Sequence, residues 1–474
     1  MDDRDALLRR TAELAGGFLD RLPVRPVSQA VNLPELRDAL GGPFPVSGED
    51  PLAVIEALAR RVEPALVGSA GPRYFGFVVG GGVPAALAAD WLASAWDQNA
   101  AMFVMSPAAA VVEEVAARWL LDLFGLPECS SVGFVTGATM ASFTALAAGR
   151  HALLARAGWD VEDDGLVGSP PIAVVVGEEA HVTILASLQM LGLGRARVHR
   201  VATDGQGRMR VEALRTTLAR IAGPTLVCAQ AGNVNTGAFD PLVEIVAAVR
   251  ELPDAWLHVD GAFGLWAAAV PGMRDRVAGL AGADSWTTDA HKWLNVPYDS
   301  GIVIVRDAAA HHAAMTLGAA YYVETAGDER DGYNWVPESS RRARGFAVYA
   351  ALRSLGRDGL AEMIERCCTL ARRMADGLRR AAGVTVLNEV VLNQVLVRFQ
   401  PPGGGDADAF TRAVIAAVQA DGTCWLGGTA WHGMAAMRIS VSSWSTTEQD
   451  ADLSVEVILR CAREVGATGF SGGG

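Results

Sequence analysis

Between residues 130 and 305, short apolar runs alternate with longer stretches in which apolar residues recur at helical spacing. The apolar runs have the length of strands and are apolar throughout, which is typical of strands buried on both faces. The predicted strands lie at 172–176, 225–229, 256–259 and 301–305, and the predicted helices at 182–191, 211–221 and 242–252. This alternation predicts an α/β fold with a mostly parallel central sheet and helices on both faces.

The chain has 474 residues, too many for one small core, so we expect more than one domain. Residues 1–95 have the pattern of an N-terminal helical segment, and 96–345 form the predicted large domain. Beyond 345, two helical stretches precede strands near 391–399 and 437–441. We therefore predict a smaller C-terminal α+β domain over 346–474.

Composition narrows the class of protein. The net charge of −13 disfavours nucleic acid and anionic membranes as partners. The start lacks the basic and apolar regions of a signal peptide, and no 18-residue apolar run occurs, so we expect a soluble cytoplasmic protein. None of the six cysteines forms a Cys-x-x-Cys pair or lies beside a histidine at zinc spacing, so no metal site is predicted.

The most informative local motif is His291-Lys292-Trp293, shortly before the strand at 301–305. A lysine that forms a Schiff base must be neutral when it attacks, and partial burial lowers its pKa to help. A half-buried structural lysine would give the same local pattern. Lys292 is therefore a candidate nucleophile, and His291 a candidate neighbour in the same site.

A second motif is His258-Val259-Asp260-Gly261-Ala262. Asp260 ends an apolar strand, and open α/β sheets bind ligands at the carboxyl ends of their strands. A carboxylate there can pair with a protonated pyridine nitrogen and keep the ring electron-poor. Ala262 is small enough to let such a ring lie flat against the backbone. A helix-capping or loop aspartate is the alternative.

Two further motifs follow predicted strands. Thr136-Gly137-Ala138-Thr139 leads from a short strand into an Ala-rich helix, and a helix N-terminus suits a phosphate group. His181 begins the helix after the strand at 172–176, where an imidazole can stack on a cofactor ring. Alone, these motifs also fit an ordinary tight turn and an ordinary histidine. Together with Asp260 and Lys292 they supply the four contacts that one cofactor, pyridoxal 5′-phosphate (PLP), needs.

These residues resemble the group II PLP-dependent decarboxylases, which include aromatic-L-amino-acid and glutamate decarboxylases. The resemblance covers nearly the whole chain, and its most specific part is Asp260 and Lys292 at a separation of 32 residues (292 − 260). Further matching segments are Gly71-Pro72-Arg73-Tyr74-Phe75-Gly76-Phe77, Ser106-Pro107-Ala108 and residues 231–240.

The resemblance implies a type I PLP fold and a homodimer with active sites at the interface. It implies that Lys292 carries PLP, that Asp260 pairs with the ring nitrogen, that His181 stacks on the ring, and that Ala138 and Thr139 hold the phosphate. Phe77 and Phe103 resemble pocket-wall positions, and Phe103 is expected to reach in from the partner subunit.

The sequence departs from the family at three places. Gly71 stands where a histidine is usual, and Asn233 and Val234 stand where many members have threonines. Asn233 or Asn235 is therefore expected to replace a hydroxyl contact to the cofactor. Asp289 stands where some relatives have an asparagine near the phosphate, and a carboxylate there would repel it.

The family's catalytic tyrosine lies on a loop before a Pro-x-x-x-Arg-Arg stretch, which resembles residues 337–342 here. We predict Tyr333 as the proton donor, with Tyr321 and Tyr322 as rivals. In the family, losing this tyrosine diverts the reaction toward oxidative deamination to an aldehyde. Arg341 or Arg342 either pairs with a substrate carboxylate or forms a structural ion pair.

The predicted reaction is decarboxylation of an L-amino acid to the amine and CO₂. An aromatic or bulky apolar substrate is favoured by Phe77, Phe103 and the aromatic residues near 425–431. The alternatives are another PLP reaction on the same scaffold, namely aldehyde synthesis, carbon–carbon lysis or amino transfer, or a catalytically silent binding protein.

Overall fold

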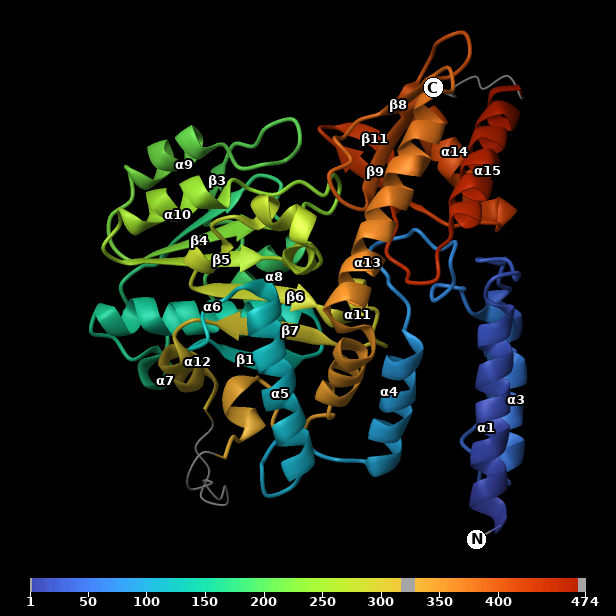
Figure 1. Ribbon diagram of the computed structural model, residues 1–474, viewed down its shortest axis with the longest axis horizontal. Helices are drawn as coiled ribbons and strands as arrows, with labels where there is room; N and C mark the ends of the chain where they lie inside the picture. Colours follow the sequence, from blue (N-terminus) through green and yellow to red (C-terminus); the bar gives the residue numbers. More distant parts are fainter. Residues whose placement is uncertain (1, 317–328, 468–474) are drawn as a thin grey trace. The chain divides into compact units, whose positions relative to one another are not determined.

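A seven-stranded sheet forms the centre of the larger of two structural units (Figure 1). The computed structural model describes residues 2–316 and 329–467. Contacts within the chain define a larger unit, Gly80–Thr369 with Asn388–Gln394, and a smaller unit, Met1–Val79 with Leu370–Leu387 and Val395–Gly474. The domain boundaries near 95 and 345 remain predictions.

The strands of the large sheet lie in the order β1-β7-β6-β5-β4-β2-β3. They are β1 (Ser131–Val135), β2 (Ala173–Gly177), β3 (His199–Val201), β4 (Thr225–Gln230), β5 (Ala255–Asp260), β6 (Ser285–Asp289) and β7 (Gly301–Val305). The pairs from β6 to β3 are parallel, whereas β7 is antiparallel to both β6 and β1. The mostly parallel sheet is therefore confirmed, and β1, β2, β4, β5 and β6 end at one edge.

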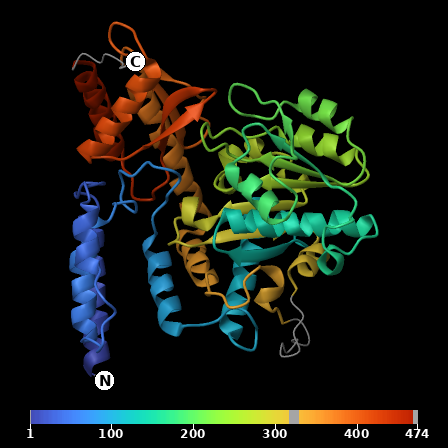
Figure 2. The same cartoon turned by 180° about the vertical axis from the view of Figure 1, so that it is seen from behind.

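Helices cover the sheet on both faces, as the two opposite views show (Figures 1 and 2). The helices of this unit are α4 (Pro84–Trp96), α5 (Pro107–Phe124), α6 (Ala138–Arg156), α7 (Val161–Asp164), α8 (Val182–Met190), α9 (Val211–Leu218), α10 (Leu242–Arg250), α11 (Ala290–Trp293) and α12 (Ala308–Met315). Short 3₁₀ turns are η2 (Gly264–Ala269), η3 (Pro271–Val277), η4 (Leu280–Gly282) and η5 (Gly332–Trp335). The predicted α/β layer arrangement is confirmed.

The core of the larger unit lies between α6 and the sheet. Helix α6 contacts β1 and β4 to β7, with α8 and α12 beside it. Its buried Ala141, Ala145 and Ala148 have helical spacing, and their small side chains let the helix approach the strands closely. Full burial of a side chain such as Leu146 stabilises the fold by about 2 kcal/mol. This packing fixes the first turn of α6 at the edge where the strands end.

The smaller unit contains a second sheet of order β10-β11-β9-β8. Its elements are α1 (Asp2–Arg21), α2 (Leu33–Leu40), α3 (Pro51–Val62), η1 (Glu63–Ala65), β8 (Val384–Val386), β9 (Gln394–Phe399), α14 (Ala407–Asp421), β10 (Gly427–Trp431), β11 (Met434–Ser440) and α15 (Glu448–Ala467). Helix α13 (Gly345–Arg379) is kinked at Gly356 (φ 61°) and contributes residues to both units. The predicted C-terminal α+β region is confirmed as a fold.

No helix among residues 2–316 and 329–467 has both the length and the hydropathy needed to cross a bilayer.

Candidate active site

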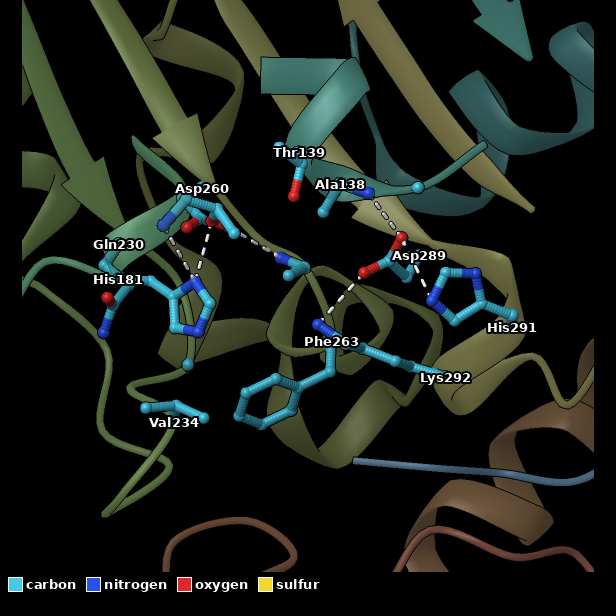
Figure 3. A pocket seen from close by; sticks show the side chains of 14 residues that line it. Ala138, Thr139, His181, Gln230, Val234, Asp260, Phe263, Asp289, His291 and Lys292 are labelled. Carbon is cyan, nitrogen blue, oxygen red and sulfur yellow. Dashed lines mark hydrogen bonds and ion pairs between the residues drawn. The ribbon is translucent and has the colours of Figure 1, made fainter. Parts of the chain in front are cut away.

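A pocket of about 240 Å³ opens where the strands of the large sheet end (Figure 3). Its walls come from the segments that follow β1, β2, β4, β5 and β6, because these strands all end at one edge. The lining residues are Gly137, Ala138, Thr139, His181, Thr183, Gln230, Gly232, Val234, Asp260, Ala262, Phe263, Asp289, His291 and Lys292. Four motifs that are far apart in the sequence therefore meet at one cavity.

The first turn of α6 forms one end of the pocket. Gly137 is the N-cap and supplies no side-chain acceptor to the helix. A Cβ at Gly301, the first residue of β7, would collide with the backbone of Gly137, so a glycine is required at this crossing. The close approach places the N-terminal amides of α6 at the cavity, where the helix dipole favours an anion.

Asp260 ends β5 and is 5% exposed. Its Oδ1 accepts a hydrogen bond from the Ala262 N–H at 3.1 Å, which fixes the carboxylate at the strand end. Ala262 itself lines the pocket. A buried carboxylate in this position can hold a protonated ring nitrogen through a charge-assisted hydrogen bond.

Lys292 lies on the short helix α11 directly after β6 and is the only lysine in the 474-residue sequence. Its side chain is 21% exposed, and its Nζ lies 3.0 Å from Oδ2 of Asp289. Every other basic side chain apart from the histidines is arginine, whose guanidinium is not a useful carbonyl nucleophile. The single side-chain amine of the protein thus faces the pocket.

His291 has a fixed tautomer. The N–H of Ser300 donates to its Nδ1 at 3.1 Å, so the proton of the neutral ring is on Nε2, 3.5 Å from Asp289 Oδ1. Burial lowers the pKa of His291, which keeps the imidazole neutral near pH 7. The ring also packs against Tyr298, with centroids 4.4 Å apart. His291 can therefore donate one hydrogen bond to an acceptor in the pocket.

His181 is the N-cap of α8, as its position after β2 predicted. Its Nδ1 lies 2.7 Å from Thr183 Oγ1 and accepts from the Thr183 N–H at 3.4 Å. These contacts orient the ring, which lines the pocket together with Asp260 (Figure 3).

Residues 35–400 match the family model described as the pyridoxal-dependent decarboxylase conserved domain. The chain belongs to this family. It is 32% identical over 388 residues to the L-2,4-diaminobutyrate decarboxylase of Rhizobium meliloti (strain 1021), covering 80% of this chain and 76% of that protein. It is 26% identical over 459 residues to an aromatic-L-amino-acid decarboxylase of Bacillus atrophaeus, covering 94% of this chain and 93% of that protein.

Solved structures support the same fold. The crystal structure of Oryza sativa TDC with PLP and tryptamine superposes with a TM-score of 0.91 at 23% identity, covering 98% of each chain. The chain is therefore a PLP-dependent amino acid decarboxylase, that is, a carboxy-lyase.

The pocket of the decarboxylase fits PLP. The start of α6, where the N-cap residue Gly137 has no side-chain acceptor, lines the pocket together with the buried carboxylate of Asp260 and the chain's one lysine. These groups match the phosphate, the ring nitrogen and the aldehyde of PLP in charge and chemistry. Gly137, Ala138 and Thr139 would hold the phosphate, and Asp260 the ring nitrogen.

Three predicted cofactor contacts do not line this pocket. The side chain of Asn233 is turned into its own loop, where Oδ1 accepts from the N–H groups of Asn235 and Thr236 at 2.9 and 3.2 Å. Asn233 and Asn235 are 1% and 7% exposed, and Gly232 and Val234 face the cavity instead. Thr136 also lies outside the lining. Their roles as cofactor contacts stay predictions.

The predicted substrate and proton-donor residues are not among the described residues that line this pocket. Phe77, in the smaller unit, is 61% exposed and stacks on Trp425 at 5.9 Å. The N–H of Phe103 donates to Asp331 Oδ1 at 2.8 Å, and Phe103 does not line the pocket of its own chain. Tyr333, in η5, is 2% exposed, is not among the lining residues, and its N–H donates to the Ala101 carbonyl at 3.0 Å. Tyr321 and Tyr322 lie outside the described residues.

The two arginines considered for substrate binding form ion pairs. Arg341, whose side chain is 1% exposed, holds Glu113 through two hydrogen bonds of 2.9 and 2.6 Å. Arg342 pairs with Asp90 at 2.8 Å. Both arginines therefore form structural ion pairs in this structure, which was the alternative to binding a substrate carboxylate.

Sequence reasoning missed several lining residues, among them Thr183, Gln230 and Phe263. Gln230 is the last residue of β4 and pairs with Asp260 across the sheet. The strand predicted at 225–229 stopped one residue short of it. Extending that strand by one residue would have placed Gln230 at the same edge as Asp260.

Proposed function

We propose that this decarboxylase acts on a neutral L-amino acid, aromatic or bulky and apolar, with Lys292 as the residue that carries PLP. The observation that carries the proposal is that the only lysine and the buried Asp260 line one pocket with the first turn of α6. When bound, PLP supplies an electron-poor ring that accepts the electron pair left when the bond from Cα to the carboxylate breaks.

The residues of the pocket divide the work. Asp260 would hold the ring nitrogen protonated, and His181 would stack on the ring and bind the substrate carboxylate. The amides of Gly137, Ala138 and Thr139 with His291 Nε2–H hold the phosphate. Lys292 would carry the cofactor through its side-chain amine, and the same amine, when it is not bonded to the cofactor, would accept or donate a proton beside Cα.

The proton that replaces CO₂ at Cα comes from Lys292 or a tyrosine. Tyr333 remains the predicted tyrosine, and Tyr321 and Tyr322 remain its rivals. Single substitutions to phenylalanine separate the three. In air-saturated buffer, with O₂ as the oxidant, the variant that loses amine formation and gains aldehyde and ammonia identifies the donor.

The preference for a side chain without a carboxylate rests on charge. Among the described lining residues there is no arginine, and the cationic amine of Lys292 is committed to the cofactor. Arg341 and Arg342 are engaged by Glu113 and Asp90. A second carboxylate on the substrate would therefore lack a partner, and would meet Asp260 and Asp289. The names of relatives that act on aromatic amino acids agree with this preference.

The test is CO₂ release from tryptophan, phenylalanine, 2,4-diaminobutyrate and glutamate, with the products analysed. We expect amine plus CO₂, with the aromatic substrates turned over at the highest kcat/KM. Aldehyde plus ammonia, or a keto acid, would assign another PLP reaction. A preference for 2,4-diaminobutyrate would assign the substrate of the Rhizobium meliloti relative, and PLP binding without turnover of any amino acid would indicate a silent protein.

We further propose a cytoplasmic homodimer with Phe103 in the partner's pocket. The larger unit exposes Trp91, Leu92 and Trp96 on α4, and Val104 and Met105 beside Phe103, which is more apolar surface than scattered exposed residues give. None of the six cysteines, which all lie in the described part of the chain, is in a disulfide, and five are buried, which suits a reducing compartment.

Two measurements test the dimer. Sedimentation should give twice 49.7 kDa. Mixing Lys292→Ala and Phe103→Ala subunits should restore activity that neither variant has alone, because one pocket of each mixed dimer then has both residues intact. A monomer, or mixed dimers without activity, contradicts the shared site.

A further inference from the structure

One buried carboxylate, Asp289, connects two of the proposed cofactor contacts (Figure 3). Its side chain is 3% exposed. Oδ1 accepts the Ala138 N–H at 2.6 Å, and Oδ2 lies 3.0 Å from Lys292 Nζ. Asp289 therefore joins the first turn of α6 to the lysine.

The contact to Ala138 gives α6 a cap from another element. Gly137 offers no side-chain acceptor, so the Asp289 carboxylate takes its place at the positive end of the helix dipole. The distance of 2.6 Å is that of a charge-assisted hydrogen bond. Any other anion that binds at this turn must compete with Asp289 for the same amide.

The local charges do not offset a second anion. The described charged or titratable groups beside Asp289 are Lys292 and His291, and Asp299 lies beyond His291. Burial lowers the pKa of His291, so its ring is neutral near pH 7. The positive charge of Lys292 is offset by the carboxylate of Asp289. None of these groups therefore supplies a further positive charge for a phosphate dianion.

We propose that Asp289 is a positioning residue that competes with the phosphate group of the cofactor for the start of α6 and so weakens the binding of phosphate-bearing ligands. The inference rests on the proposed placement of the phosphate. Asp289 thereby sets how firmly the phosphate group of the cofactor is held.

The experiment compares two ligands that differ only in the phosphate, 4-deoxypyridoxine 5′-phosphate and 4-deoxypyridoxine. Neither has an aldehyde, so neither can bond to Lys292. Their dissociation constants are measured by calorimetry on the full cofactor-free chain, for the wild type and for Asp289→Asn. Asparagine has the same shape and keeps an acceptor for the Ala138 N–H.

We expect Asp289→Asn to bind the phosphorylated ligand about tenfold more tightly, because one like charge is removed from a buried site. The ligand without phosphate should bind both proteins within about twofold, which a general loosening of the pocket would not give. Asp289→Glu keeps the charge and should not bind the phosphate more tightly. Asp307→Asn removes a charge while preserving the N-cap of α12, and should match the wild type.

An equal or lower affinity of Asp289→Asn for the phosphorylated ligand overturns the inference and leaves the proposed function standing. If the wild type binds neither ligand, the proposed cofactor site itself fails.

Discussion

At the scale of single residues, the proposed chemistry of this pocket depends on one amine and on one carboxylate at the end of β5. Lys292 is the only lysine of the chain, and Asp260 is the carboxylate at the end of β5. A protein with one side-chain amine can form a side-chain Schiff base at one position only. This simplifies every test of the chemistry.

Replacing Lys292 with alanine should abolish covalent attachment of PLP. Borohydride reduction of the wild type with PLP should add one label at position 292, found by peptide mass spectrometry. In Lys292→Ala, only the terminal amine remains to react, and kcat should fall by about 10³-fold, within the range for a lost proton-transfer group. A fully active, unlabelled variant would contradict the assignment.

Replacing Asp260 with asparagine should lower kcat by about 10²-fold, because the ring nitrogen loses the charge that keeps it protonated. Asparagine retains an acceptor for the Ala262 N–H, so thermal stability should change little. The measurements are kcat and the melting temperature of the variant and of the wild type, and we expect kcat to fall while the melting temperature stays nearly the same. A variant with normal kcat would remove Asp260 from the ring-nitrogen role.

At the scale of elements, the crossing of β7 with the turn before α6 determines the shape of the site. The first residue of β7, Gly301, lies against the backbone of Gly137 with no room for a Cβ. Packing at this crossing therefore connects the strand after the lysine to the proposed phosphate turn.

Gly301→Ala should destabilise the protein by about 2 kcal/mol, the typical cost of overpacking, and should weaken PLP binding. Gly205→Ala is the matched control, because a Cβ there meets no atom within 4 Å. Urea denaturation and PLP titration of both variants give the comparison. If the two variants had the same free energy of unfolding and the same affinity for PLP, the crossing would tolerate a side chain at Gly301.

The sequence predicted elements where side chains were uniformly apolar, and it failed where polar residues are buried. The strand at 301–305 was predicted with its observed bounds. Strand β6 was not predicted as a strand, because Ser285, Thr287 and Thr288 are polar, yet all three are 0% exposed. Likewise the type of residue at Asn233 suggested a ligand contact, but its Oδ1 accepts from the backbone of its own loop and its Nδ2 donates to the Glu179 carbonyl. Side-chain direction in such loops depends on tertiary contacts that no local pattern records.

At the scale of the whole molecule, three buried titratable groups make folding depend on pH. Burial lowers the pKa of His258 and of His311 to about 3. Burial also raises the pKa of Asp240 to about 6. The two histidines and the aspartate act in opposite directions on acidification.

Stability should fall as the pH drops from 7 to 5. Below about 6.5 the unfolded chain binds protons at both histidines while the folded chain does not, which costs about 2 kcal/mol for each by pH 5. Asp240 takes up its proton in the folded state near pH 6 and returns about 1 kcal/mol. The expected net loss is about 3 kcal/mol, measured by urea denaturation at each pH.

The variant His311→Asn should flatten this dependence, because one of the two imidazoles is gone. Asp240→Asn should steepen it. A protein that is as stable at pH 5 as at pH 7, with both histidines present, would contradict this account.

The antiparallel placement of β7 has a consequence for evolution and for engineering. Eight residues, 293–300, join Lys292 to a strand whose first residue is wedged against the proposed phosphate turn. This short connection fixes the distance between Lys292, the proposed site of covalent attachment, and the proposed anion site. An insertion or deletion in this connection would change the length of a ligand that can reach both sites at once. Insertions far from this edge of the sheet would leave that length unchanged.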